Sequence, residues 1–244
     1  MRTTIFIFII FFIPIFLFPQ DSDEPEMEME MEMESPSTKN ASVLSEEISG
    51  IASSDLLLLK TIFNSNSEIA PNESGIFTVK PGAYTLPYAS SSLPTDKYGF
   101  YGAKNLDDES IKTAWSEGKK DSGIGEWIAI KNDNSFTAVV INNGWCKDQK
   151  GWENNNRVEK AKVRIYTYSI ESADVIKIGK NKAEYVIVFE DEYDDAYWQV
   201  WTGITGISRK DFANYLFILE ILGVYKGKKY DDTCISEISL TIMQ

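Results

Sequence analysis

Apolar and polar residues alternate along the second half of the chain, from Phe77 onward. Residues 161–168 show the pattern, with Ala161, Val163 and Ile165 on one face of the predicted strand and charged or tyrosine side chains on the other. Clusters of Asn, Asp, Gly and Lys separate such runs, for example residues 131–134 and 179–182. The predicted strands are residues 127–130, 136–141, 161–168, 175–178, 185–189, 198–201, 215–221 and 235–242.

Short strands separated by turns predict an all-β fold, an antiparallel sandwich or jelly roll. We place this domain at residues 76–244, with a helical turn only at residues 208–215. Its length is sufficient for one hydrophobic core. Within it, Gly123 and Gly125 are expected to permit a tight turn, because the surrounding pattern is β and no helix follows them.

The first 20 residues have the pattern of a signal peptide or an N-terminal anchor. Residues 5–18 are almost wholly Ile, Phe and Leu, fewer than the roughly 20 apolar residues that span a bilayer. We therefore expect the protein to be exported, secreted or associated with the cell envelope. No small-x-small triplet follows Phe18 to mark cleavage, so cleavage and retention both stay open.

Residues 21–75 are predicted to form an acidic, low-complexity spacer. Met and Glu alternate over residues 27–34, and residues 21–34 carry eight acidic and no basic side chains, most of the net charge of -13. Dense like charge favours a solvated, disordered segment over a strand. One amphipathic stretch, residues 43–63, could form a short helix, either packed on the domain or part of a stalk. No basic stripe exists to neutralise phosphates, which argues against a nucleic-acid partner.

The composition removes several classes of catalytic site. The chain has no histidine, which excludes Ser-His and Cys-His nucleophiles and His-ligated zinc. Paired carboxylates such as Asp191 and Glu192 are typical of solvated turns, so we expect no enzyme activity. The two cysteines, Cys146 and Cys234, could form a disulfide in an exported protein or remain buried free thiols, and the sequence leaves both open.

One interstrand loop combines the side chains that bind sugars. Aromatic faces stack on sugar rings, while amide and guanidinium groups donate hydrogen bonds to hydroxyls. The candidate ligand residues are Trp145, Lys147, Trp152, Asn155 and Arg157. In a competing interpretation, Asn155 and Arg157 fix the loop by bonding its backbone. A second aromatic group, Tyr193, Tyr197 and Trp198, is better explained by strand packing.

A cation site is suggested by two acidic segments far apart in the chain. Glu237 lies on the last predicted strand, on the face opposite Ile238 and Leu240. About 130 residues earlier, residues 105–115 form an acidic loop that ends in a hydroxyl side chain, Thr113. Together they could supply the oxygen ligands that calcium requires.

Four segments in this order resemble a known family. They are residues 103–118, 123–128, 143–158 and 225–238. Together they are similar to the NAD glycohydrolase translocation domain, a discoidin-like or coagulation factor 5/8 type C relative with a galactose-binding-like jelly roll. The resemblance covers residues 101–240. It implies a glycan-binding or surface-binding accessory module, linked in its family to delivery of an NAD-cleaving toxin domain, without catalytic activity of its own.

The resemblance also implies a structural calcium between the acidic loop and the last strand. Asp107, Thr113 and Glu237 match that arrangement by position, with Asn105 or Glu109 as additional ligands. In the alternative, Asp107 and Thr113 cap a turn, and Glu237 pairs with Lys228 or Lys229.

The expected function is therefore an exported, non-catalytic module that recognises a carbohydrate or another cell-surface ligand, as an accessory to a secreted enzyme or toxin. The alternative is an envelope-associated domain that docks to another protein through its aromatic edge.

Overall fold

A computed structural model describes residues 48–49, 51–66, 69–72, 76–193, 199–202 and 212–242. All of them belong to one compact unit, residues 38–244. The predicted signal segment, the Met-Glu repeat, Tyr197, Trp198 and residues 208–211 lie outside the described residues. Within the described part, no helix has the length and apolar character needed to cross a membrane.

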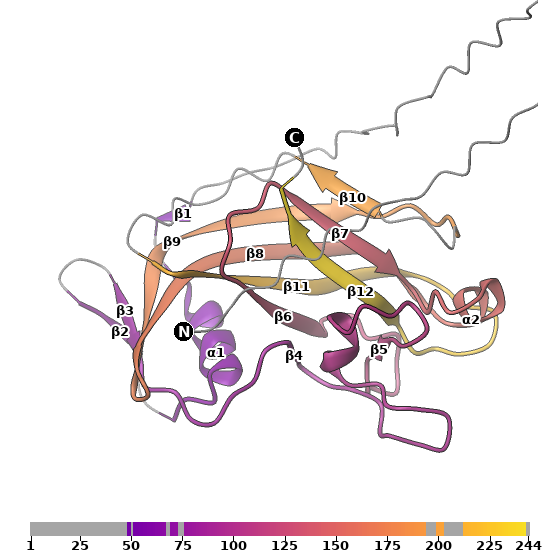
Figure 1. The fold of residues 1–244 in the computed structure, drawn as a ribbon, viewed down its shortest axis with the longest axis horizontal. Coiled ribbons are helices and arrows are strands. Elements are labelled where there is room, and N and C mark those ends of the chain that lie inside the picture. The colour runs from indigo at the N-terminus through magenta and orange to yellow at the C-terminus, as the bar shows by residue number, and fades with distance from the viewer. Residues whose placement is uncertain are drawn as a thin grey trace, which may run out of the picture. The chain divides into compact units, whose positions relative to one another are not determined.

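Two antiparallel sheets form the domain, which confirms the predicted all-β sandwich (Figure 1). The larger sheet has the order β2-β3-β9-β8-β11-β6-β4, with β1 paired to β9, and the smaller has the order β10-β7-β12-β5. The strands of the larger sheet are β1 (Ile48–Ser49), β2 (Ala70–Pro71), β3 (Phe77–Val79), β4 (Tyr88–Ala89), β6 (Trp127–Asn132), β8 (Arg157–Ser172), β9 (Val175–Val188) and β11 (Asn214–Tyr225). Those of the smaller are β5 (Trp115–Ser116), β7 (Ala138–Asn143), β10 (Gln199–Thr202) and β12 (Cys234–Thr241).

Strands β8 and β9 correct the prediction. They form one long hairpin, and the predicted strands 175–178 and 185–189 are two ends of the single strand β9. The cluster at residues 179–182, expected to be a turn, lies inside this strand. A register shift between Tyr166 and Tyr168 of β8 accommodates it, and a Cβ atom on Gly179 would lie 2.4 Å from the Thr167 hydroxyl. This glycine therefore marks a close approach of two strands.

The helices were only partly foreseen. α1 (Ser53–Ile62) lies inside the expected stretch 43–63. The 3₁₀ helix η1 (Ala103–Leu106) and α2 (Gln149–Asn154) were not predicted. The side chain of Asp148 accepts a hydrogen bond from the backbone N–H of Gly151 and so begins α2. Tyr215, expected to end a helical turn, is part of β11.

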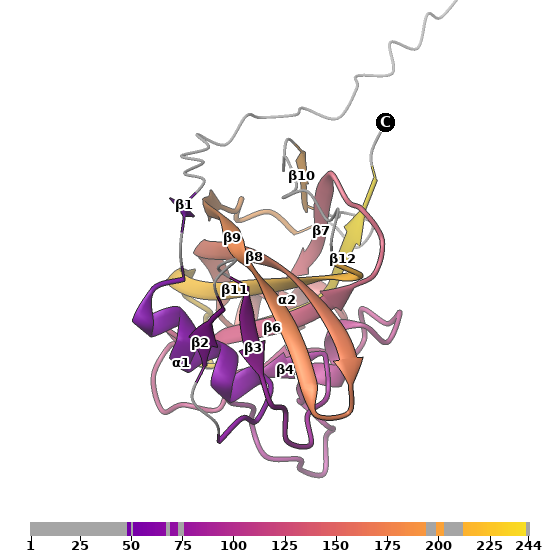
Figure 2. The ribbon, with the colours of Figure 1, turned by 90° about the vertical axis from the view of Figure 1, so that its left-hand side faces the viewer.

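Two hydrophobic clusters cover opposite faces of the larger sheet. The first fills the space between the sheets and includes Trp115, Val163 and Ile165. The second lies outside the larger sheet, where Leu59, Ile62 and Phe63 of the α1 segment pack on Tyr166 and Tyr168. Figure 2 shows α1 beside this outer face. The predicted half-buried strand at residues 161–168 is therefore buried on both faces, because an element outside the alternating pattern covers its polar face.

A charged network accompanies this second cluster. Asp55 of α1 is buried, and its Oδ1 lies 3.4 Å from Nε of Arg164 on β8. The Arg164 guanidinium also contacts Glu220 on β11 at 2.7 Å. The outward-facing arginine thus joins the helix to two strands, and α1 packs on the domain rather than extending as a stalk.

The Gly123–Gly125 turn is confirmed. Both glycines have positive φ, 72° and 86°. A Cβ atom on Gly123 would lie 2.5 Å from Cγ of the buried Glu117. Only glycine fits this conformation so close to a buried side chain.

Candidate functional site

Several loops meet around the start of β12. Gly144 pairs with Ile235 and Asn156 with Thr233, so the loop that contains α2 lies against the segment leading into β12. The backbone N–H of Lys228 donates to the Glu153 carbonyl at 2.8 Å. Figure 1 shows β5 and α2 at this same end of the sandwich. The loops singled out in the sequence are thus brought together.

Arg157 is committed to holding this loop. Its side chain is 5% exposed and donates to both carboxylate oxygens of Asp191, through Nε at 2.8 Å and Nη2 at 2.9 Å. Nη1 donates to the carbonyls of Trp152 and Asn155 at 3.2 and 3.0 Å. The guanidinium also lies 4.1 Å from the centre of the Trp152 ring. All three guanidinium nitrogens therefore donate to groups of the protein, Nη1 to carbonyls of this loop and Nε and Nη2 to Asp191.

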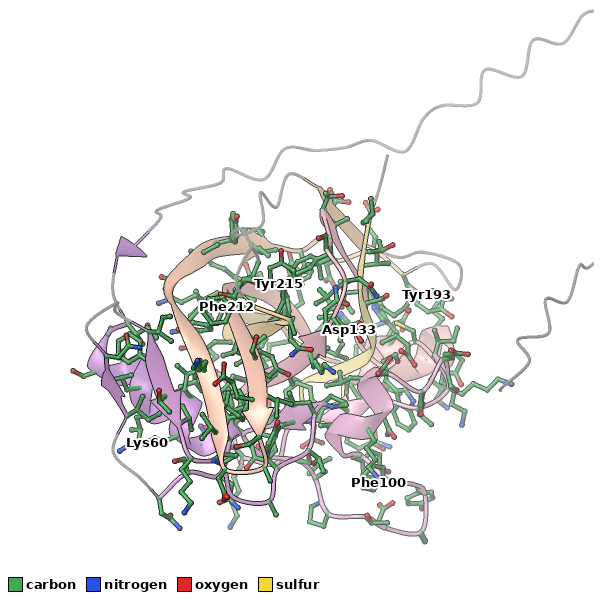
Figure 3. The ribbon with its side chains drawn as sticks, turned by 60° about the vertical axis from the view of Figure 1, so that its left-hand side comes forward. Lys60, Phe100, Asp133, Tyr193, Phe212 and Tyr215 are labelled. Atoms are coloured by element: carbon green, nitrogen blue, oxygen red, sulfur yellow. The ribbon has the colours of Figure 1, made fainter. Side chains whose placement is uncertain are left out.

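Trp152 and Asn155 have the same role. The Trp152 indole N–H donates to the Asn143 carbonyl at 2.9 Å, and its buried ring packs 5.6 Å from that of Tyr193, which lies beside α2 in Figure 3. The Asn155 amide donates to the Gly151 carbonyl at 2.8 Å. The competing interpretation, in which these side chains fix the loop, therefore describes Trp152, Asn155 and Arg157 better than ligand contact does.

Trp145 and Lys147 face outward from the same loop. Trp145 is half-buried, and its indole N–H donates to the Lys112 carbonyl at 3.1 Å. The Tyr101 ring meets it edge-on, with ring centres 6.4 Å apart. The Lys147 ammonium lies 5.8 Å from the centre of the Trp145 ring. Of the five predicted ligand residues, these two keep surface that a ligand could contact.

Sequence reasoning missed other exposed aromatic side chains on neighbouring loops. Tyr98 is 75% exposed and Tyr230 is 43% exposed, and Phe100 lies on the loop labelled at the edge of the domain in Figure 3. Each tyrosine directly follows a lysine, Lys97 or Lys229. That Lys-Tyr repeat was the available signal, but neither loop has the periodicity that marks an element.

The predicted cation ligands divide into two groups. Asn105 is buried, and its amide donates to the carbonyls of Phe100 and Ala114 at 2.6 and 2.8 Å, so it ties the loop together. Asp107 is exposed. The Thr113 hydroxyl donates to the carboxylate of Asp108, the residue after Asp107, at 2.8 Å. Asp108, which was not among the predicted ligands, is therefore the acidic residue that Thr113 contacts, while the assignment of Asp107 stays a prediction.

Glu237 faces this acidic loop from β12. It is 5% exposed, and Oε1 accepts a hydrogen bond from the Ser110 backbone N–H at 2.7 Å. Burial in the first place, and the nearby Asp108 carboxylate in addition, raise the pKa of Glu237 to about 7. The alternative partner Lys228 binds Glu153 instead, at 2.5 Å. Asp108, Thr113 and Glu237 therefore present oxygen atoms to one another across the loop. In the described residues, no set of three or more acidic, cysteine or histidine side chains could hold a metal, and this site contributes two carboxylates and one hydroxyl.

The two cysteines are buried free thiols in this structure. Burial raises the pKa of each to about 12. The backbone N–H of Cys146 donates to the Ser236 hydroxyl, two residues after Cys234, at 3.0 Å. Of the two alternatives left open by the sequence, the structure shows free thiols on neighbouring segments.

The solved structures similar to this chain include two of a GH29 fucosidase of Ruminococcus gnavus in complex with fucose, one of them a point mutant. Each has 15% sequence identity and a TM-score of 0.31, and the match covers 76% of this chain but 28% of the fucosidase chain. The chain thus spans under a third of the length of those proteins, and so low a score carries no argument. No curated protein matches the chain.

The family model of the NAD glycohydrolase translocation F5/8 type C domain matches residues 82–241, about two thirds of the sequence. The chain belongs to this family.

Proposed function

We propose that this chain is a non-catalytic binding module that attaches an exported protein to a carbohydrate or another cell-surface ligand. The observation that carries the proposal is the outward-facing Trp145, held by the Lys112 carbonyl and the Tyr101 ring at the end of the sandwich where several loops meet. A fixed aromatic face among polar loops is suited to stacking on a sugar ring, since no conformational freedom is lost on binding.

Absence of catalysis is part of the proposal. The chain has no histidine, and the Asp191 carboxylate that could have served a hydrolase is bound by Arg157. The family is described by translocation rather than by a reaction. These observations support a binding role over an enzymatic one.

The proposed function also includes an accessory role in secretion. The family description connects the domain with an NAD glycohydrolase, and the first 20 residues have the pattern of a signal peptide or anchor. In this proposal the acidic spacer separates the domain from the membrane or from its processing site, and the module guides a secreted enzyme or toxin partner to a surface.

Replacing Trp145 with alanine is expected to weaken glycan binding about 2- to 10-fold, because one aromatic contact contributes roughly 0.5–1.5 kcal/mol. A glycan array identifies the bound structure, and calorimetry on the purified chain measures the loss. Ile170→Ala is the control, because this exposed side chain lies on β8 at the turn into β9. An unchanged affinity in folded Trp145→Ala protein would place the site elsewhere. One dominant protein partner with no sugar competition would favour the docking alternative.

The proposal also includes a structural calcium ion. Asp108, Glu237 and the Thr113 hydroxyl would supply side-chain oxygens, with loop carbonyls completing the six to eight ligands that calcium takes. Two carboxylates placed this close favour either a shared proton or a cation. Calcium bound there would fasten the loop between η1 and β5 to the last strand.

Calcium is expected to raise the melting temperature of chelated protein by roughly 5–10 °C at a hundredfold excess over its Kd. The rise should be larger at pH 8 than at pH 6, because the raised pKa of Glu237, about 7, means that a proton occupies this carboxyl at the lower pH. Differential scanning calorimetry measures it. Glu237→Gln should remove the rise and Asp107→Asn should retain it. No rise at pH 8 would remove calcium from the proposal.

A further inference from the structure

Three aromatic side chains at the loop end each carry a lysine over the ring. The Lys97 ammonium lies 4.8 Å from the centre of the Tyr98 ring, and that of Lys229 lies 4.7 Å from Tyr230. Lys147 lies 5.8 Å from Trp145. We call these six residues the lysine-aromatic surface. Each pair presents a stacking face and a positive charge within reach of one ligand residue.

The three pairs belong to one surface. The backbone N–H of Ser116 donates to the Tyr101 carbonyl at 3.1 Å, and Ser116 pairs with Cys234, four residues after Tyr230. The segments that carry Tyr98 and Tyr230 therefore both border β5. The Tyr230 hydroxyl raises the pKa of Lys229, and Tyr98 contributes to the same shift. Tyr101, three residues after Tyr98, reaches the Trp145 ring. The loop of residues 96–101 therefore contacts the Trp145 loop and borders the segment that carries Tyr230.

The positive charges of this surface are not neutralised by ion pairs. Within the described residues, no carboxylate forms a salt bridge with the ammonium groups of Lys97, Lys147 and Lys229, whereas neighbouring acids have other partners. Asp231 pairs with Lys226, and Glu153 pairs with Lys228. The three lysines thus remain available to an anionic ligand.

The loop at the centre of this surface is internally braced. Asp96 accepts hydrogen bonds from the backbone N–H groups of Tyr98 and Gly99 and from the Tyr101 hydroxyl, and the first of these lowers the pKa of the Asp96 carboxyl. Phe100 folds back over Gly102, where a Cβ atom would meet its ring. Phe100 nevertheless stays 51% exposed. The preference for an extended polar ligand over a lipid bilayer therefore rests on the lysines and tyrosines of the surface, whose ammonium and hydroxyl groups bind polar groups.

We propose that the lysine-aromatic surface selects acidic glycans, whose carboxylate or sulfate groups bind the three ammonium groups while their sugar rings stack on Tyr98, Trp145 and Tyr230. This inference rests on the glycan-binding function proposed above and specifies its ligand class. Charge-assisted hydrogen bonds supply the preference, and the aromatic faces supply contact that any sugar can make.

The test is an array that pairs each acidic glycan, bearing uronic acid, sialic acid or sulfate, with a neutral glycan of the same backbone. The acidic member should bind about 10-fold more tightly, because three exposed charge contacts each contribute modestly. The triple variant Lys97→Gln, Lys147→Gln and Lys229→Gln should lose this preference, so that the acidic and neutral members of each pair bind it alike. The control triple variant, Lys60→Gln, Lys80→Gln and Lys131→Gln, changes the net charge equally and should retain it.

The outcomes separate the two proposals. Equal binding of acidic and neutral members would overturn the acidic specificity and leave the glycan-binding function standing. Binding to no glycan would overturn both. Binding to phosphatidylserine vesicles that depends on the same three lysines, without competition by acidic glycans, would assign the surface to a membrane instead.

Discussion

A chain that begins at Gly82, where the family match starts, is expected to lose its cooperative unfolding transition. The deletion removes Leu59, Ile62 and Phe63, which are fully buried against the outer face of the larger sheet. Loss of one such side chain typically costs about 2–5 kcal/mol, and the net stability of a domain is only about 5–15 kcal/mol. Urea unfolding followed by near-ultraviolet circular dichroism measures the effect.

Two point variants make this prediction specific. Leu59→Ala should lower the free energy of unfolding by about 2–5 kcal/mol. Leu57→Ala, on the same helix but 68% exposed, should change it by less than about 0.5 kcal/mol. A chain starting at residue 48 should unfold like the full sequence. If the chain starting at Gly82 has the same urea midpoint as that longer chain, α1 does not stabilise the domain.

The strand pattern predicted the fold class but not what covers the sheet. Alternation at residues 161–168 correctly assigns Val163 and Ile165 to the interior. It cannot show that Tyr166 and Tyr168 are also buried, because that depends on a helix about 100 residues away in the sequence. The same limit applies to Gly179, whose place within β9 depends on a register shift in the partner strand. Local propensity does not contain such tertiary information.

The candidate sites show a similar division. Residue types placed Trp145, Trp152 and Arg157 in one loop, which the structure confirms, but the sequence cannot tell an inward from an outward side chain in an irregular segment. The same limit applies to the acidic loop, where Thr113 donates to Asp108 and not to the predicted ligand Asp107.

Arg157→Ala is expected to lower the free energy of unfolding by about 3 kcal/mol. The variant leaves two buried carbonyls, of Trp152 and Asn155, without their donor, at a cost of roughly 1–3 kcal/mol for each such group. It also removes a cation–π contact with the Trp152 ring. The remaining Asp191 side chain is 37% exposed and regains water, so its unpaired charge adds little.

Matched variants distinguish the loop-bracing role of Arg157 from ligand contact. Arg157→Lys should recover only part of the stability, because an ammonium cannot donate to a carboxylate and two carbonyls with the geometry of a guanidinium fork. Asp191→Asn should also cost about 3 kcal/mol, because it leaves the buried charge of Arg157 without its carboxylate partner. Urea unfolding compares the three, and glycan affinity is measured on the folded fraction. If Arg157→Ala protein has an unchanged urea midpoint but no longer binds glycan, Arg157 contacts the ligand and does not brace the loop. If Arg157→Ala protein is less stable but retains its glycan affinity, Arg157 braces the loop, and Trp145 and the loops around it bind the glycan.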